Sequence, residues 1–599
     1  MQMLACLLFS FALLTDVHIS NSNSKPLEDL TNSVNEINAT DGIDFVLVSG
    51  DVTESGDKKA MKTVKSQLDR LTIPYYITSG NHETTWSESG VMDFSRVFGD
   101  NRFAFEYDSV LFIGFNSGPV LKMADGHVAP QDIIWAEKLL KEHAGQRVIA
   151  VTHYPLQFGD VDNWYDVTDL LRQYNVQCVL GGHYHRNLVF NCDGITDILS
   201  RSNLRDKDGI NGYGIFSVDK DSIRAFEKRI GEPARQWTAI ANEDRHYGPS
   251  DPALRPSFAM NEEYANVKHA WQRRMGVGIY ASPTMAGNRV YIGDDEGNFY
   301  CLKLSDGTTE WQFKAGSRIF STAAVADDKV VFGSTDNIIY CLNASTGEKI
   351  WTLETRAAVM GSPVIKDGVV FVGGSDGCMR ALKLEDGSDV WSFCEMKNYY
   401  NSRPTIYKDK IYFGAWDSYL YALNIKDGTL AWKWNNGTSS DKLSPAAVWP
   451  VVANNRVFVA APDRYMTCLD AQSGQVIWRT NRYKVRETAA INAANTMVYS
   501  KCMWDTVVAF SATSKEVETR WAVNAEFGYE HAPCMPLEKD GTVFVGTKNG
   551  VIIGMDAETG KILWRHKIGS SLIQTTLPLS GKDCLVTSTD GTVTRLKIE

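Results

Sequence analysis

Five short motifs in the N-terminal third of the chain combine side chains that could bind metal ions. In chain order they are Asp16-Val17-His18, Gly50-Asp51, Gly80-Asn81-His82-Glu83, Thr152-His153-Tyr154-Pro155 and Gly182-His183-Tyr184-His185. Carboxylate and amide oxygens are hard ligands, and imidazole nitrogen suits borderline divalent ions. A single histidine after a strand is usually structural, but five such motifs in one chain favour a shared site.

The types of side chain in these motifs suit a pair of ions. Two carboxylates, one amide oxygen and four imidazoles are available, which is enough for two ions about 3.5 Å apart. Such a pair lowers the pKa of a bridging water and clamps the oxygens of a phosphoryl group during in-line attack. The residues themselves therefore predict metal-assisted hydrolysis of a phosphoester.

Each motif follows an apolar run that has the length of a buried strand. Strands are predicted at 11–15, 44–51, 73–81, 147–155 and 176–183, with another at 110–117, an amphipathic helix at 129–143 and a closing hairpin at 212–229. Alternating strands and helices predict a layered α/β domain. Its functional residues should lie in the loops just after the strands.

The five motifs resemble those of the calcineurin-like metallophosphoesterase superfamily over residues 11–230. The resemblance implies an α/β layered sandwich that binds two divalent metal ions, Mn, Fe or Zn. It also implies a role for each motif residue. One metal would be bound by Asp16, His18 and His185, the other by Asn81, His153 and His183, and Asp51 would bridge the two.

The same resemblance implies that His82 is catalytic and not a metal ligand. It would face the substrate and either protonate the leaving oxygen or stabilise the phosphate. Glu83 would either orient His82 or serve only as a surface or capping residue.

Two departures narrow the class of phosphoesterase. The stretch 50–56 lacks the phosphate-binding Arg of protein serine/threonine phosphatases, and Thr53 or Glu54 stands where purple acid phosphatases have Tyr. The remaining sequence looks more like the cyclic-nucleotide phosphodiesterases, with mono- or diester left open. Rim residues that could contact substrate, or simply pack or face solvent, are Trp86, Tyr154, Trp164, Tyr184 and Arg186.

The rest of the chain is periodic. A tryptophan closes each unit, at positions 311, 351, 391, 432, 478, 521 and 564. Spacings of 40 to 46 residues, with several short strands in each unit, are typical of propeller blades. The last unit stops before its tryptophan strand, and Trp271 has no blade of its own. We therefore expect the strand around Trp271 to close a ring of eight blades.

These repeats resemble the PQQ-like propellers of quinoprotein dehydrogenases and BamB-type assembly proteins. We assign residues 266–599 to this all-β eight-bladed propeller and residues 231–265, which are polar and rich in Pro, to a linker. The quinone cofactor PQQ is not expected, because no Cys-Cys dipeptide occurs. The repeated tryptophans are interpreted as packing between blades.

Composition excludes several classes of protein. Of 599 residues, 44% are hydrophobic and 22% charged, as in soluble proteins with a core. The net charge of −11 argues against a nucleic-acid-binding surface. No run is apolar enough to span a membrane, and the 11 scattered cysteines indicate neither a disulfide framework nor a zinc site.

The N-terminus bears on location. Residues 1–14 are apolar like the core of an export signal, but no basic region precedes them, and cleavage after Leu14 would remove the first strand. Either the signal is degenerate or the true start lies upstream. We expect a periplasmic or cell-surface protein.

Three functions are compatible with the sequence. The first is a binuclear-metal phosphoesterase whose propeller positions substrate or binds a protein or glycan partner. The second is a non-catalytic scaffold for envelope assembly with a vestigial phosphoesterase domain, although no ligand has been lost. The third, a quinoprotein oxidoreductase, is disfavoured by the missing cysteine pair.

Overall fold

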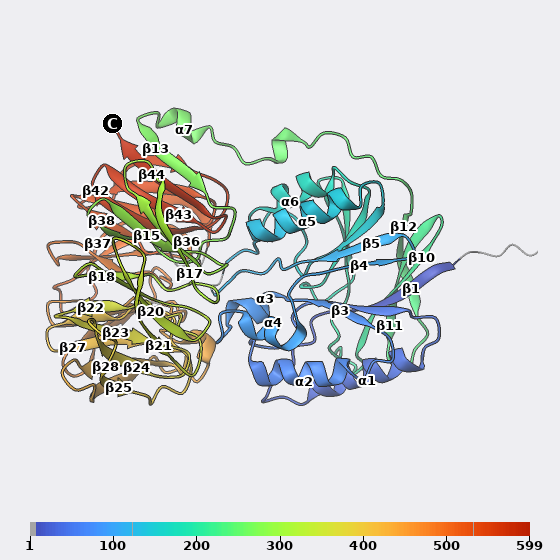
Figure 1. Cartoon of the computed structure of the whole chain (residues 1–599), viewed down its shortest axis with the longest axis horizontal. Coiled ribbons are helices and arrows are strands. Elements are labelled where there is room, and N and C mark those ends of the chain that lie inside the picture. The colour runs from blue at the N-terminus through green and yellow to red at the C-terminus, as the bar shows by residue number, and fades with distance from the viewer. Residues whose placement is uncertain (1–6, 122–123, 448, 531, 533) are drawn as a thin grey trace, which may run out of the picture. The chain divides into compact units, whose positions relative to one another are not determined.

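The computed structural model describes residues 7–121, 124–447, 449–530, 532 and 534–599 (Figure 1). They form two compact units, the first made up of most of the residues up to Pro256 and the second mainly of the residues from Ser257 onward. Residues 1–6 of the proposed export signal lie outside the described part. Within that part, no helix has the length and hydropathy needed to cross a bilayer.

The first unit contains two six-stranded sheets. The first sheet has the order β12-β11-β10-β1-β2-β3, in which β1, β2 and β3 are parallel. Its strands are β1 (Leu7–Leu14), β2 (Phe45–Ser49), β3 (Tyr75–Thr78), β10 (Gly212–Asp219), β11 (Ser222–Arg229) and β12 (Arg235–Ala241). The strands β10 and β11 confirm the predicted closing hairpin.

The second sheet has the order β4-β5-β6-β7-β9-β8, in which β5, β6, β7 and β9 are parallel. Its strands are β4 (Phe103–Tyr107), β5 (Val110–Gly114), β6 (Arg147–Val151), β7 (Val176–Gly181), β8 (Leu188–Cys192) and β9 (Ile195–Leu199).

The two sheets pack face to face between two layers of helices, as Figure 1 shows. Phe11 and Phe45 stack at 5.1 Å between centroids, and Phe112 of the other sheet meets both rings edge-on. Strands buried on both faces must be apolar throughout, which explains the runs in the sequence. The helices are α1 (Lys25–Ala39), α2 (Lys58–Leu68), α3 (Asn81–Thr85), α4 (Met92–Phe98), α5 (Pro130–Glu142) and α6 (Trp164–Leu171). The predicted layered α/β sandwich is confirmed.

The prediction of a linker at 231–265 is wrong for the first part of that segment, which contains a strand. Residues Arg235–Ala241 form β12, which pairs with β11 and extends the first sheet. The strand lies at a sheet edge and is largely exposed, and its apolar residues do not alternate regularly with polar ones, so it lacks the pattern that marks a strand in sequence. A 3-10 turn (Pro252–Leu254) and the short helix α7 (Met260–Glu263) follow it.

The second unit is an eight-bladed propeller of four-stranded antiparallel sheets. Blades one to four are β14 (Thr284–Ala286), β15 (Arg289–Gly293), β16 (Asn298–Lys303), β17 (Thr309–Lys314); β18 (Ala324–Ala326), β19 (Lys329–Gly333), β20 (Ile338–Asn343), β21 (Lys349–Glu354); β22 (Val364–Lys366), β23 (Val369–Gly373), β24 (Met379–Lys383), β25 (Asp389–Phe393); and β26 (Thr405–Tyr407), β27 (Lys410–Gly414), β28 (Tyr419–Asn424), β29 (Leu430–Asn435).

Blades five to seven are β30 (Val451–Ala453), β31 (Arg456–Ala460), β32 (Met466–Asp470), β33 (Val476–Thr480); β34 (Ala490–Ile491), β35 (Met497–Lys501), β36 (Trp504–Ser511), β37 (Thr519–Tyr529); and β38 (Leu537–Lys539), β39 (Thr542–Gly546), β40 (Val551–Asp556), β41 (Ile562–Lys567). A 3-10 turn, Asp441–Leu443, precedes blade five.

The eighth blade joins the two ends of the propeller sequence, as predicted. Its order is β13-β44-β43-β42, and β13 (Val267–Arg274), which contains Trp271, pairs antiparallel with β44 (Thr592–Ile598). The other strands are β42 (Ile573–Ser580) and β43 (Asp583–Ser588). Closing the ring in this way pairs the edges that an open array of strands would expose.

The repeated tryptophans link neighbouring blades. Six of them donate an indole N–H to a backbone carbonyl of the next blade, at 2.9–3.2 Å: Trp271, Trp311, Trp351, Trp391, Trp432 and Trp521. Each of these rings also lies against the turn glycine of that next blade. The interpretation of these residues as packing between blades is confirmed.

Two tryptophans lack this bond, and the sequence explains why. The turn after Trp478 has Lys515 in place of glycine, and the indole nitrogen of Trp478 has no hydrogen-bond partner in the described part of the chain. The carbonyl of Ala512 instead accepts a bond from Arg456 at 2.9 Å. After Trp564 no continuous turn exists, because β44 and β13 are the two ends of the ring.

One disulfide was not predicted. Cys378 and Cys394 lie at the open end of the β24–β25 hairpin and are bonded. The remaining described cysteines are free and buried.

We predict that the glycine-tryptophan contact is required for blade packing. In Gly387→Ala the added Cβ would lie 2.8 Å from the Trp351 ring, so overpacking adds to the cost of a positive φ. The matched control is Gly368→Ala in the same blade, where φ is +73° against +74° and no atom lies within 4 Å. Urea unfolding should show a loss of about 3 kcal/mol for Gly387→Ala and about 1 kcal/mol for the control. Equal losses would contradict the proposed role of the contact.

Candidate metal centre

All five predicted motifs lie just after parallel strands of the first unit. Asp16 and His18 follow β1, Asp51 follows β2, and α3 starts at Asn81 after β3. In the second sheet the motif with His153 follows β6, and the motif with His183 and His185 follows β7. The ends of these strands therefore bring motifs from two sheets together.

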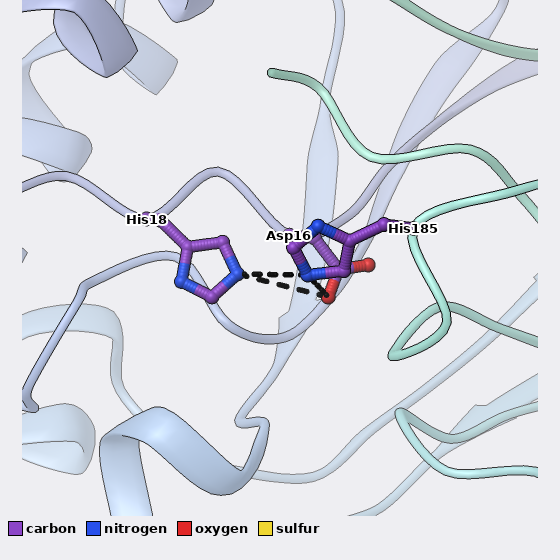
Figure 2. A group of neighbouring side chains, drawn as sticks. All are labelled: Asp16, His18 and His185. Atoms are coloured by element: carbon purple, nitrogen blue, oxygen red, sulfur yellow. Dashed lines mark hydrogen bonds and ion pairs between the residues drawn. The ribbon is translucent and has the colours of Figure 1, made fainter. Parts of the chain in front are cut away.

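Asp16, His18 and His185 form one group of possible ligands (Figure 2). The His185 Nε2 atom lies 3.3 Å from Asp16 Oδ1 and 3.2 Å from His18 Nε2. Asp16 and His18 are buried, whereas His185 is exposed. The three side chains point toward one another from the ends of β1 and β7.

A second group consists of Asp51, His153 and His183. The Nε2 atom of His153 lies 3.0 Å from Asp51 Oδ2, and both residues are buried. The backbone carbonyl of Ser49 fixes the ring of His153, because it accepts from Nδ1 at 2.8 Å and leaves Nε2 facing the carboxylate. These two groups are the two ligand sets that the resemblance implies, apart from Asn81.

A strained backbone presents most of these candidate ligands. Asp16, His18, Asp51, His183 and His185 all have φ between 50° and 70°. Residues other than glycine rarely adopt this conformation, which costs roughly 1–3 kcal/mol each. Five strained residues in one site require surrounding structure to hold them, and such strain is typical of functional sites.

The motif glycines allow the loops to approach closely. A Cβ on Gly80 would lie 2.3 Å from Asp51 Oδ1, and one on Gly182 would lie 1.9 Å from Thr15 Oγ1. No other residue type leaves enough space at these two positions.

The site's electrostatics couple carboxylates to imidazoles. Burial by itself would raise the pKa of Asp51, but the neighbouring His153 outweighs it and holds that pKa below its usual range. Burial lowers the pKa of His153, yet the carboxylate of Asp51 raises it to about 9. Burial and the nearby His153 lower the pKa of His183 to about 4. The carboxylates thus attract positive charge into a buried site.

The donor set fits divalent cations. The Oδ1 atom of Asn81 is buried and has no hydrogen-bond partner among the described residues, although a buried amide oxygen normally has one. Asp16 Oδ1 is surrounded by imidazole nitrogens, with those of His18, His153 and His185 all within 3.9 Å. Buried oxygen and nitrogen lone pairs that converge in this way could hold metal ions.

His82 lies beside both groups. Its Nδ1 donates to the backbone carbonyl of Glu54 at 2.7 Å, so its Nε2 faces the site, 3.9 Å from Asp51 Oδ2. Its backbone N–H donates to Asp51 Oδ1 at 2.8 Å. His82, His18 and Asp51 also form a third group of side chains that could hold a metal ion.

Glu83 has the capping role and does not orient His82. Its carboxylate accepts from the backbone N–H of Thr53 and of Gly80 and from the Thr53 hydroxyl, at 2.8–2.9 Å. These bonds tie the loop after β2 to the start of α3.

Sequence reasoning missed Ser117. Its buried hydroxyl oxygen accepts from the backbone N–H of His153 at 3.2 Å and of Tyr154 at 3.0 Å. Ser117 therefore fixes the loop that presents His153. It is the last residue of the predicted strand 110–117, and only that position hinted at a role.

Asp197 of β9 was also missed. Its carboxylate is buried and accepts from the backbone N–H of Leu156 at 3.0 Å, on the loop that starts at His153. Burial raises the pKa of Asp197 to about 7.

The predicted rim residues differ in exposure. Trp164 is buried under the guanidinium of Arg255, and Tyr154 is buried with its ring 3.9 Å from that of His183. Trp86 meets His82 edge-on at 5.3 Å. Tyr184 is half-buried and Arg186 is exposed, so these two are the better placed to meet a solute.

We predict that Ser117→Ala weakens metal binding about 10- to 100-fold, as expected when a group that positions a ligand is lost. Titration with Mn²⁺ measured by calorimetry tests this. The control is Ser222→Ala on β11, which removes a hydroxyl that donates to the carboxylate of Asp219. Unchanged affinity in Ser117→Ala would show that the loop holds His153 without it.

We also predict a pH-dependent loss of stability that Asp197→Asn removes. Because the folded-state pKa is raised above the unfolded value of about 4, the contribution of Asp197 is fully present below pH 4 and is lost as pH rises through 7. The loss is on the order of 4 kcal/mol. Urea unfolding between pH 4 and 9 should show it for the natural chain and for the exposed control Asp221→Asn. The same pH dependence in Asp197→Asn would contradict the assignment.

Comparisons with known proteins identify both units. The family model described as outer membrane protein assembly factor BamB matches residues 220–392, 321–518 and 505–599, together more than half of the chain. The model described as calcineurin-like phosphoesterase matches residues 9–187.

Curated relatives match the first unit. A probable glycerophosphodiester phosphodiesterase GpdQ from Arcobacter nitrofigilis is 25% identical over 183 residues, 28% of this chain and 60% of that protein. Serine/threonine-protein phosphatase CPPED1 from Rattus norvegicus is 30% identical over 136 residues, 19% of this chain and 42% of that protein. A probable cyclic nucleotide phosphodiesterase from Vesicomyosocius okutanii is 23% identical over 232 residues, 35% of this chain and 94% of that protein. The chain thus spans 60% of the length of the first of these relatives and 42% of the second.

Among solved structures, BamB from Moraxella catarrhalis covers 56% of this chain and 98% of its own, at 17% identity and a TM-score of 0.46. Taken together, the family matches and the two units show that the chain belongs to the BamB family of PQQ-like propellers and carries a calcineurin-like phosphoesterase domain ahead of its propeller.

Proposed function

We propose that the protein is a binuclear-metal phosphoesterase that hydrolyses a phosphomonoester or phosphodiester. The observation that carries the proposal is the convergence of buried ligand atoms from five motifs, with the amide oxygen of Asn81 left without a protein partner. When bound, two divalent ions would lower the pKa of a water and neutralise charge on the phosphoryl group.

In this proposal each metal has its own ligands. Asp16, His18 and His185 would hold one ion, and Asn81, His153 and His183 would hold the other. Asp51 lies within reach of His153 and His82 and would be shared by the two ions.

His82 acts on the substrate. Its Nδ1–H is engaged with the carbonyl of Glu54, which fixes the ring and directs Nε2 into the site. From there a protonated Nε2 can donate a hydrogen bond to a phosphoryl oxygen or a proton to the leaving oxygen.

The propeller serves as a binding or positioning module for a protein or glycan partner. The Cys378–Cys394 disulfide supports a periplasmic or cell-surface location, because disulfides persist in oxidising compartments. A non-catalytic envelope scaffold is the alternative, and the same experiment decides between the two.

The test uses the full chain with Mn²⁺, Zn²⁺ or Fe²⁺ on bis-p-nitrophenyl phosphate and p-nitrophenyl phosphate. We expect hydrolysis with two ions bound per chain, at least a 100-fold lower kcat in Asp51→Asn, and no change in the exposed control Asp221→Asn. His82→Ala should lower kcat while keeping both ions. Equal rates for Asp51→Asn and the natural chain on every ester would favour the scaffold.

A further inference from the structure

An exposed aromatic ring stands on the loop that presents His153. Phe158 has 86% of its surface exposed, more than any other large hydrophobic residue recorded for the described part of the chain. It lies five residues after His153 in a loop that follows β6. Exposing an aromatic ring to water forgoes the free energy of its burial, so its position calls for an explanation.

The loop under Phe158 is firmly built. Gly126 and the loop exchange backbone hydrogen bonds, from Gly126 N–H to Asp160 at 2.7 Å and from Asp162 N–H to Gly126 at 2.8 Å. The Asn163 side chain binds both the N–H and the carbonyl of Val128, at 3.0 and 2.7 Å. The residues around the tip are therefore fixed, and Phe158 is presented by an ordered base.

The same loop is tied to the turn that carries two of the ligands. The Tyr184 hydroxyl donates to Asp160 Oδ1 at 2.8 Å, and Gln157 donates to the other oxygen of Asp160 at 2.8 Å. Tyr184 stands between His183 and His185, so its ring is held beside the site by Asp160, two residues from Phe158.

These contacts hold the half-buried ring of Tyr184 next to His183, 5.4 Å between centroids, and put the exposed ring of Phe158 two residues along the chain from the Asp160 that binds Tyr184. A planar aromatic group of a substrate can stack on such side chains. This stacking depends little on which aromatic ring the substrate carries. An aliphatic group can pack against the same rings but lacks the planar face needed for stacking.

We propose that Phe158 and Tyr184 form a specificity subsite that takes a planar aromatic group, a nucleobase or an aryl ring, on the substituent of the phosphoester. Phe158 supplies the ring that stacks, and Asp160 positions Tyr184. This inference rests on the proposed function of the same site and adds the class of substrate.

The test compares esters that release the same p-nitrophenolate but differ in the second substituent: thymidine 5′-p-nitrophenyl phosphate, phenyl p-nitrophenyl phosphate and methyl p-nitrophenyl phosphate. In the full, metal-loaded chain, Phe158→Ala should lower kcat/KM about ten-fold for one or both aromatic esters and by less than two-fold for the methyl ester. Loss on the thymidine ester alone assigns a nucleobase, and loss on both assigns any aryl ring. Phe158→Trp should retain the preference. The matched control is Ile134→Ala on α5, which removes another exposed apolar side chain and should change none of the rates.

Binding provides a readout that does not depend on turnover. Calorimetry should show that the natural chain binds phenylphosphonate more tightly than methylphosphonate, and that Phe158→Ala removes the difference. Equal effects of Phe158→Ala on all three esters, or no effect on any, would overturn the inference while leaving the proposed function intact. Absence of hydrolysis that depends on Asp51 would instead overturn the proposed function, and the phosphonate affinities would then decide the subsite separately.

Discussion

Two buried carboxylates at the ends of adjacent parallel strands constrain how the loops of the first unit are built. Asp16 and Asp51 lie on neighbouring loops, where the backbone N–H of Asp16 donates to the carbonyl of Gly50 at 3.1 Å. Each carboxylate disfavours charge on the other. They are tolerated because imidazoles from both sheets surround them, and cations would satisfy the same lone pairs.

Much of the surrounding structure follows from that constraint. The loops must approach closely, which requires glycine at 80 and 182, and five of the candidate ligands adopt left-handed backbone conformations. Such strain persists only where other bonds over-determine the backbone. The backbone N–H groups of Asp16 and His18 donate to the carbonyls of Gly50 and Asp51, and that of His183 donates to Asp16 Oδ2. Ser117, Glu83 and Asp197 fix the neighbouring segments of the same loops.

The motifs and the repeat could be predicted from sequence because each has a recognisable pattern of residue types. The five metal motifs have fixed spacings, and the tryptophans mark a period. Even the exception at Trp478 could be anticipated from Lys515. By contrast, β12 is an edge strand without regular alternation. The partner of Cys378 depends on the hairpin that brings Cys394 to it, and Ser117 and Asp197 act through backbone N–H groups that leave no trace in sequence.

The same distinction separates the chemistry of the site from its choice of substrate. His153 and Asp160 lie on one loop after β6, but metal binding restricts only the residue type at position 153. A metal ion fixes the residue types that can stand at position 153 and at the other ligand positions, so those residues form readable motifs. Nothing in that chemistry fixes Asp160 or the exposed ring of Phe158. A phosphoesterase can therefore change the group it accepts by altering the tip of this loop, while the bonds to Ser117 and Ser49 keep His153 in place.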